Sequence, residues 1–156
     1  MPIATPIDNY LDGPQVLRKA VAGMSQEQLI ARPIPGKWST LEVICHLADF
    51  EIVFADRIKR VIAESEPTLF GGDPDAFAAR LAYHDRQAAE ELLLIETIRS
   101  QVARILRSLG PQDFQRRGVH SESGPLTLET LVQRITGHIP HHVRFIDEKR
   151  KALARP

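Results

Sequence analysis

Residues 39–64, STLEVICHLADFEIVFADRIKRVIAE, decide the fold of this chain. Ser39 and Glu42 have the spacing of a capping box, which predicts a helix from about Thr40 to about Glu64. At about 100° per residue, the apolar residues of this helix fall on one stripe: Val43, Leu47, Phe50, Phe54 and Val61. His46 lies within about 70° of the centre of the stripe, so its imidazole should point toward the core or along its rim.

Helical periodicity also dominates the rest of the chain, with further amphipathic helices expected over residues 5–23, 86–109 and 128–152. Gly13-Pro14 interrupts the first of these. Because proline disfavours the α conformation in the residue before it, this helix should either restart or bend there. Ser25 and Gln28 form a second capping-box pattern, which predicts a short helical turn over residues 26–31.

The connections between the helices differ in length. Residues 65–85 form a long crossover, with a helical turn expected at 75–82, and this length allows the helices on either side to be parallel neighbours. Residues 111–126 should be a polar loop, because no segment shows a sustained strand alternation. The sequence therefore predicts an all-α protein, a four-helix bundle built as one domain over residues 1–156.

Composition limits the partners and the compartment. Lys and Arg together number 20, as do Asp and Glu, so the net charge is zero and binding of the nucleic-acid backbone is not expected. The basic run Lys149-Arg150-Lys151 is interpreted as helix-end charge. Cys45 is the single cysteine, and no leader or long apolar run is present, so we expect a cytoplasmic chain with no membrane partner.

Three histidines on the apolar stripes are the candidate site. His138 and His142 are four residues apart on the helix over 128–152, which places their Cβ atoms roughly 6 Å apart. Together with His46, they would offer a divalent metal three ligands and leave one position open, and imidazole ligation favours zinc or nickel. The alternative is three core histidines whose ring nitrogens are satisfied by hydrogen bonds.

No catalytic residue stands out, although three side chains near the stripes are candidates. Asp49 and Glu42 each lie about one turn from His46, so either could be a fourth ligand, an acceptor behind a ligand or a general base. Glu42 is better explained by helix capping, and Asp49 could also face solvent. Arg99 lies on an apolar stripe and could hold an anionic substrate, but a structural ion pair explains it better.

The other polar candidates are weaker. His141 lies beside the stripe and could exchange a proton at the rim of the site or simply face solvent. His84 and His120 are in predicted loops and are expected to be surface residues. Cys45 lies about 100° around the helix from His46, so it is expected to be a buried apolar residue rather than a nucleophile.

Two sequence patterns resemble a known family. Pro35-Gly36-Lys37-Trp38-Ser39, followed by Glu42-Val43 and His46-Leu47-Ala48-Asp49, resembles the N-terminal motif of the DinB/YfiT-like superfamily. Gly124 and Thr127, followed by His138 and His142 with His141 between them, resemble its C-terminal motif. The match extends over nearly the whole chain.

The resemblance implies a four-helix bundle of DinB/YfiT type whose divalent metal is bound by His46, His138 and His142. It also implies an enzyme with a small-molecule substrate, and a homodimer. Some members of the family are S-transferases that use low-molecular-weight thiols such as bacillithiol or mycothiol, and others are named metal-dependent hydrolases. The resemblance therefore predicts a hydrolase or a thiol transferase without choosing between them.

A non-catalytic role is the rival interpretation. In that case the metal would clamp two helices of a stress-related helical bundle, and a fourth protein ligand from Asp49 or His141 would close the site. An open coordination position beside a cleft would favour the enzyme.

Overall fold

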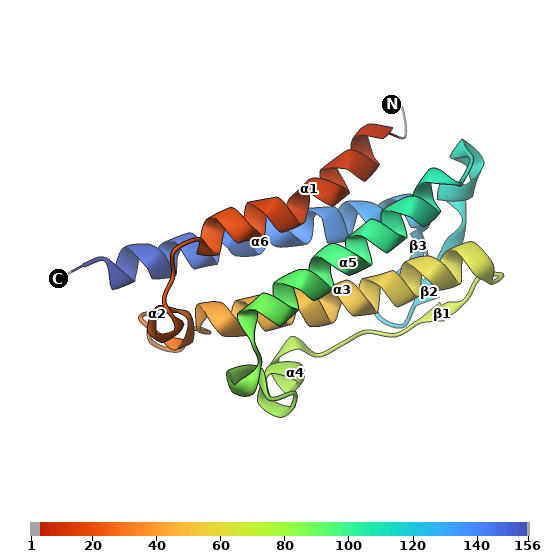
Figure 1. Ribbon diagram of the computed structural model, residues 1–156. Coiled ribbons are helices and arrows are strands. Elements are labelled where there is room, and N and C mark those ends of the chain that lie inside the picture. The colour runs from red at the N-terminus through yellow and green to blue at the C-terminus, as the bar shows by residue number, and fades with distance from the viewer. Residues whose placement is uncertain (1–3, 156) are drawn as a thin grey trace.

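The computed structural model describes residues 4–155, most of them in helices (Figure 1). The helices are α1 (Ala4–Val21), α2 (Gln26–Ile30), α3 (Thr40–Ala63), α4 (Pro74–Arg80), α5 (Ala88–Arg107) and α6 (Leu128–Leu153). Single 3-10 turns lie at Tyr83–Asp85 and Pro111–Gln115, and three short strands are β1 (Thr68–Leu69), β2 (Arg117–His120) and β3 (Gly124–Thr127). Among the described helices, none combines the length and apolar character needed to cross a bilayer.

The four long helices form the predicted bundle. Helix α1 packs against α5 and α6, and α3 packs against the same two helices from the other side. In Figure 1, α3 and α5 run in one direction and α1 and α6 in the other. The crossover through residues 64–87 therefore joins parallel neighbours, as its length allows.

The capping signals read from the sequence are confirmed. At the start of α3, the Ser39 hydroxyl accepts the Glu42 N–H at 3.1 Å, and the Glu42 carboxylate accepts the Ser39 N–H at 3.0 Å. Ser25 and Gln28 make the same reciprocal pair at α2. These bonds satisfy backbone donors that a helix start otherwise leaves free.

Helix α1 runs through Gly13-Pro14 without restarting, and the reason lies in its contact with α5. Pro14 has no N–H, so it cannot donate to the Tyr10 carbonyl one turn earlier. The Arg99 guanidinium donates to this carbonyl instead, at 2.6 Å. A Cβ on Gly13 would lie 2.3 Å from Arg99 Nη1, so glycine provides the space through which the guanidinium reaches α1.

Arg99 connects all four long helices. It forms a bidentate pair with Glu51 of α3 at 2.9 and 3.0 Å, and it also donates to the Ile135 carbonyl of α6 at 2.9 Å. Its guanidinium lies over the Tyr10 ring, 4.6 Å from the centroid. Burial raises the pKa of Glu51, and the Arg99 charge opposes that shift. The structure therefore shows Arg99 in a structural ion pair, which the sequence favoured over binding of an anionic substrate.

The expectation of a loop without strands over residues 111–126 was wrong. Strands β2 and β3 form an antiparallel hairpin, and β1 from the crossover pairs parallel to β2. Gly118 allows the close approach of β1, because a Cβ there would lie 2.9 Å from the Leu69 side chain. The hairpin turn ends at Gly124, whose φ of 74° suits glycine. The small sheet lies beside the end of α3 and the start of α6 (Figure 1).

Candidate metal centre

The three predicted histidines meet between α3 and α6. One ring nitrogen from each of His46, His138 and His142 lies within 4.8 Å of the other two. The Nε2 atoms of His46 and His138 are 3.0 Å apart, and the centroid of the His142 ring is 4.7 Å from both of the other rings. The i, i+4 spacing on α6 and the inward position of His46 on α3 therefore produce one cluster.

Aromatic rings fix the position of His46. Trp38, in the loop before α3, lies 5.2 Å from the His46 ring, and Phe50, one turn later on α3, lies 4.8 Å from it. Phe50 packs in turn against Phe77 of α4 at 5.2 Å. The crossover thus supports the site indirectly, through the contact between the Phe77 and Phe50 rings.

Burial determines the charge of the cluster. His46 is only 4% exposed, and burial lowers its pKa to about 4. Burial also lowers the pKa of His142 to about 4 and that of His138 to about 3, and in both cases the neighbouring imidazoles add to the effect. At neutral pH the rings are uncharged, so each carries a lone pair that can bind a cation.

The donor set suits a divalent metal. Zinc–nitrogen bonds of about 2.0–2.1 Å in tetrahedral geometry place two ligand nitrogens about 3.3 Å apart, and the Nε2 atoms of His46 and His138 are close to that spacing. A single proton between His46 and His138 bridges two nitrogens only, whereas a cation would engage all three. The Nδ1 atoms of His46 and His138 are buried without a protein partner among residues 4–155. Hydrogen bonds within the protein therefore do not account for this cluster.

Asp49 is engaged elsewhere. Both of its carboxylate oxygens accept hydrogen bonds from Arg86, at 2.7 and 3.0 Å, and Arg86 also pairs with Glu91 of α5. Asp49 is buried rather than turned toward solvent. Within the described chain, no Asp, Glu or Cys joins the three-histidine group.

Glu42 and Arg99 also have structural partners. Besides capping α3, Glu42 accepts a hydrogen bond from Arg32 at 2.8 Å. Arg99 is completely buried, and its three guanidinium nitrogens all donate to Glu51 or to backbone carbonyls. Neither side chain is directed at the histidine cluster.

His141 and Cys45 lie beside ligand candidates in sequence but point differently. His141 is exposed, with its ring 5.1 Å from that of His142. Cys45 is fully buried, its thiol donates to the Tyr83 carbonyl, and burial raises its pKa to about 12. A thiol in that state is a poor nucleophile.

His84 and His120 are remote from the cluster. The Nε2 of His84 accepts a hydrogen bond from Arg32 at 2.8 Å on the surface. His120 is buried rather than a surface residue, and its Nδ1 accepts the backbone N–H groups of Glu122 and Ser123, both at 3.1 Å. It stabilises the hairpin turn.

The positions of two residues beside the cluster, Lys149 and Trp38, were not predicted from the sequence. Lys149 was interpreted as helix-end charge, yet it is only 3% exposed, and with Trp38 it lines a hollow that reaches His142. The signal was present in the spacing, because His142, Phe145 and Lys149 are at i, i+3 and i+7 and share one face of α6.

Comparisons with known proteins point to one family. The family model of the DinB superfamily matches residues 10–146. A relative from Oceanobacillus iheyensis, named "Putative metal-dependent hydrolase", is 31% identical over 140 residues, which cover 90% of this chain and 81% of the relative. YfiT of Bacillus subtilis carries the same designation and is 27% identical over 136 residues, 86% of this chain and 76% of YfiT.

A solved structure supports the fold. The structure of Bacillus subtilis YfiT, described as "a probable metal-dependent hydrolase with an unusual four-helix bundle topology", matches with a TM-score of 0.90 at 24% identity. The match covers 99% of this chain and 89% of that structure. Because the family model extends over most of the sequence and the Oceanobacillus relative exceeds 30% identity along nine-tenths of it, this chain belongs to the DinB superfamily.

Proposed function

We propose that this protein is a metal-dependent enzyme, most simply a hydrolase of a small molecule, in which His46, His138 and His142 bind a divalent ion. One observation carries the proposal: three neutral imidazoles converge within 4.8 Å, and no fourth ligand group among the described residues joins them. Structural zinc sites are normally closed by four protein ligands, whereas catalytic sites use three. The names of the relatives point in the same direction.

The bound ion would supply Lewis-acid chemistry, which polarises a substrate bond and lowers the pKa of water or a thiol into the neutral range. The chain's own residues prepare the site for this. Trp38 and Phe50 hold the His46 ring and exclude water from one side of it. His141 is the exposed imidazole beside the site, so its ring nitrogens can exchange a proton with solvent at the rim.

Metal content is the first test. We expect about one divalent ion per chain after purification without chelator, with zinc or nickel favoured by imidazole ligation. His142→Ala should abolish tight binding, because two imidazoles remain. His84→Ala is the matched control, since this exposed ring is bonded to Arg32 and should leave the metal content unchanged. A protein that ignores added Zn²⁺ and Ni²⁺ would refute the site.

The reaction is tested with a panel of activated esters and of small thiols paired with an electrophile. Ester hydrolysis by the metal-loaded protein without added thiol would support the hydrolase. Acceleration only when a thiol is present would instead favour the low-molecular-weight thiol transferase, in which a cation stabilises the thiolate. Both activities should survive Cys45→Ala, because the buried thiol is not the nucleophile. If the wild-type rates equal those of His142→Ala across the panel, the non-catalytic interpretation would be favoured, in which the metal only holds two helices together.

A further inference from the structure

A hollow of about 350 Å³ opens beside the histidine cluster. The loop before α3 forms one wall with Trp38 and Lys37, and the late turns of α6 form the other with His142, Phe145 and Lys149. This volume is within the range of small-molecule sites, about 300–1,000 Å³. Because His142 reaches into the hollow, a molecule bound there would lie next to the proposed metal.

Lys149 is the unusual residue of this hollow. It is 3% exposed, and its ammonium has one hydrogen bond, to the Phe145 carbonyl at 3.3 Å. Among residues 4–155, no carboxylate lies within salt-bridge distance of it, although most other buried charges of the chain have such a partner. Burial lowers its pKa. A buried ammonium without a salt-bridge partner is costly, and an anion in the hollow would offset that cost.

The charges around Lys149 favour an anion. Lys37 lines the opposite wall, and Glu148 is the one carboxylate in the lining. Within this lining the basic groups therefore outnumber the acidic ones, and Glu42 of α3 adds negative charge from outside it. Trp38, Phe145 and Val43 add an apolar surface between these charges and the histidines.

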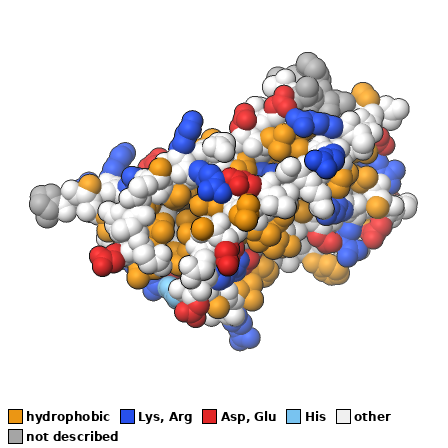
Figure 2. Space-filling view, viewed as in Figure 1, with side chains coloured by type: hydrophobic (Ala, Val, Ile, Leu, Met, Phe, Trp, Pro, Cys, Tyr) orange, Lys and Arg blue, Asp and Glu red, His pale blue; other side chains and the backbone are white. Residues whose placement is uncertain are grey.

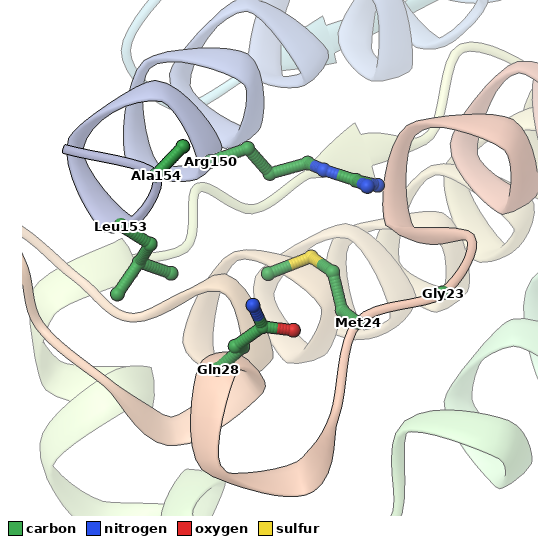
Figure 3. Close-up of a pocket in the computed structure, with 6 residues that line it drawn as sticks. All are labelled: Gly23, Met24, Gln28, Arg150, Leu153 and Ala154. Atoms are coloured by element: carbon green, nitrogen blue, oxygen red, sulfur yellow. The ribbon is translucent and has the colours of Figure 1, made fainter. Parts of the chain in front are cut away.

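A second hollow provides a comparison, because its basic side chain is already bound within the protein. It lies between the end of α1 and the end of α6 (Figure 3), measures about 190 Å³, and is lined by Gly23, Met24, Gln28, Arg150, Leu153 and Ala154. Its cation is already engaged, because Arg150 donates to the carbonyls of Ala20 and Ala22 at 2.8 and 2.9 Å. Gln28 completes the capping box of α2, so both polar side chains of this lining have a structural role.

We propose that the hollow beside His142 binds the anionic group of a small molecule that also has an apolar part. Lys149, with Lys37 opposite, binds the negative charge, and the Trp38 and Phe145 rings contact the apolar part. The inference rests on the proposed function, since it describes the substrate of that metal site. It names the class as a small organic anion, such as a carboxylate or a phosphonate.

Trp38 makes a direct binding test practical, because it is the single tryptophan of the chain and lines the hollow. The probes are 3-phenylpropionate, phenethylphosphonate and the neutral isostere 3-phenylpropanamide, titrated while Trp38 fluorescence is recorded. The full chain is used, both chelator-treated and zinc-loaded. We expect the anions to bind about tenfold or more tightly than the amide, since a charged partner strengthens a hydrogen bond to the ammonium.

Variants test which lysine is responsible for the preference for anions over the amide. Lys149→Met keeps the length of the side chain and removes its charge, so most of the preference for the anions over the amide should be lost. Lys151→Met, an exposed lysine on the same helix, should retain the full preference. Lys37→Met should lose part of it, and this exposed position tests the inference even if Lys149→Met folds poorly, which a thermal melt would reveal.

The two proposals fail in different ways. In chelator-treated protein the lysines alone can favour the anions, so the preference should persist there even if the protein proves to bind no metal. Equal binding of anions and amide by a wild-type chain that holds one metal would overturn this inference and leave the metal centre intact. An undiminished preference for the anions in Lys149→Met would also overturn it.

Discussion

Gly13 shows how a single missing side chain permits a buried interaction. A Cβ at this position would lie 2.3 Å from Arg99 Nη1 and 3.2 Å from Ile139 Cδ1. Arg99 cannot move aside, because its guanidinium is held by Glu51 and by two backbone carbonyls. We therefore expect Gly13→Ala to lower the free energy of unfolding by about 1–3 kcal/mol, as overpacked cores do. Urea denaturation measures this.

Gly137 supplies the matched control for that prediction. It also lies inside a long helix, α6, but nothing is found within 4 Å of a Cβ built there. Gly137→Ala should raise the free energy of unfolding by up to about 1 kcal/mol, because alanine is the better helix former. If both substitutions stabilise the protein, steric crowding at Gly13 is not significant.

The three histidines of the cluster could be predicted from sequence, whereas several of their neighbours could not. His46, His138 and His142 follow from helical spacing, which is a local property of the chain. The partners of Asp49 and Arg99 are set by contacts between segments that are far apart in sequence, as with Arg86, 37 residues from Asp49. The buried state of Lys149 depends on where the loop with Trp38 folds back, and no periodicity encodes that.

At the level of the elements, helix limits were predicted to within a few residues because capping signals are local. The small sheet was missed for the opposite reason. Strands β2 and β3 have four residues each and contain Gly118 and Pro125, so their alternation is too short to detect. The pairing of β2 with β1 also depends on the crossover, which is about 50 residues earlier in the chain.

Glu42, at the start of α3, should make the free energy of unfolding depend on pH. Burial pushes the pKa of Glu42 up, but the hydrogen bonds from Arg32 and from the Ser39 N–H outweigh it, so the pKa is lowered in the folded state. A lowered carboxyl pKa contributes stability above the unfolded-state value of about 4.3, and that contribution is lost as pH falls through the folded-state value.

Glu42→Gln isolates that contribution, because glutamine can still complete the capping box. At neutral pH the variant should be less stable than the wild type by about 0.5–1 kcal/mol, the usual effect of a negative charge at a helix start. The difference should shrink as pH falls below about 4, where the wild-type carboxyl is protonated too. Urea midpoints at neutral pH and in acid measure it. A difference that stays constant with pH would show that the charge of Glu42 contributes nothing.

For the whole molecule, Arg99 and Glu51 form the charged centre of the bundle. Arg99→Met leaves the Glu51 carboxylate buried without its counter-charge, so we expect a loss of about 3–5 kcal/mol in the free energy of unfolding. Adding Glu51→Leu removes that orphaned charge, and the double variant should be more stable than the single one. Chemical denaturation of both variants decides this. A double variant that is less stable than Arg99→Met would mean that Glu51 is satisfied by other groups.

The surface and the core suggest that the bundle does not need a metal to fold. Acidic and basic side chains are interspersed over the face seen in Figure 2, with hydrophobic groups between them. Inside, two apolar clusters extend along the bundle, one centred on residues such as Leu106 and Leu131 and the other on Leu47 and Ile139. Leu47 and Ile139, the chain neighbours of His46 and His138, belong to the second cluster, and the first cluster is the larger of the two.

Metal removal should therefore leave the helices intact and lower the melting temperature. A metal present at 100 times its Kd stabilises the native state by about 2.7 kcal/mol. For a domain of this size each kcal/mol moves Tm by about 2–4 °C, so a chelator should lower Tm by roughly 5–11 °C while the helical circular dichroism signal persists at room temperature. His138→Ala should melt at one temperature with or without added zinc, because its site lacks one imidazole. Loss of the helical signal on chelation, as in a zinc finger, would show that the apolar clusters cannot hold the four helices together alone.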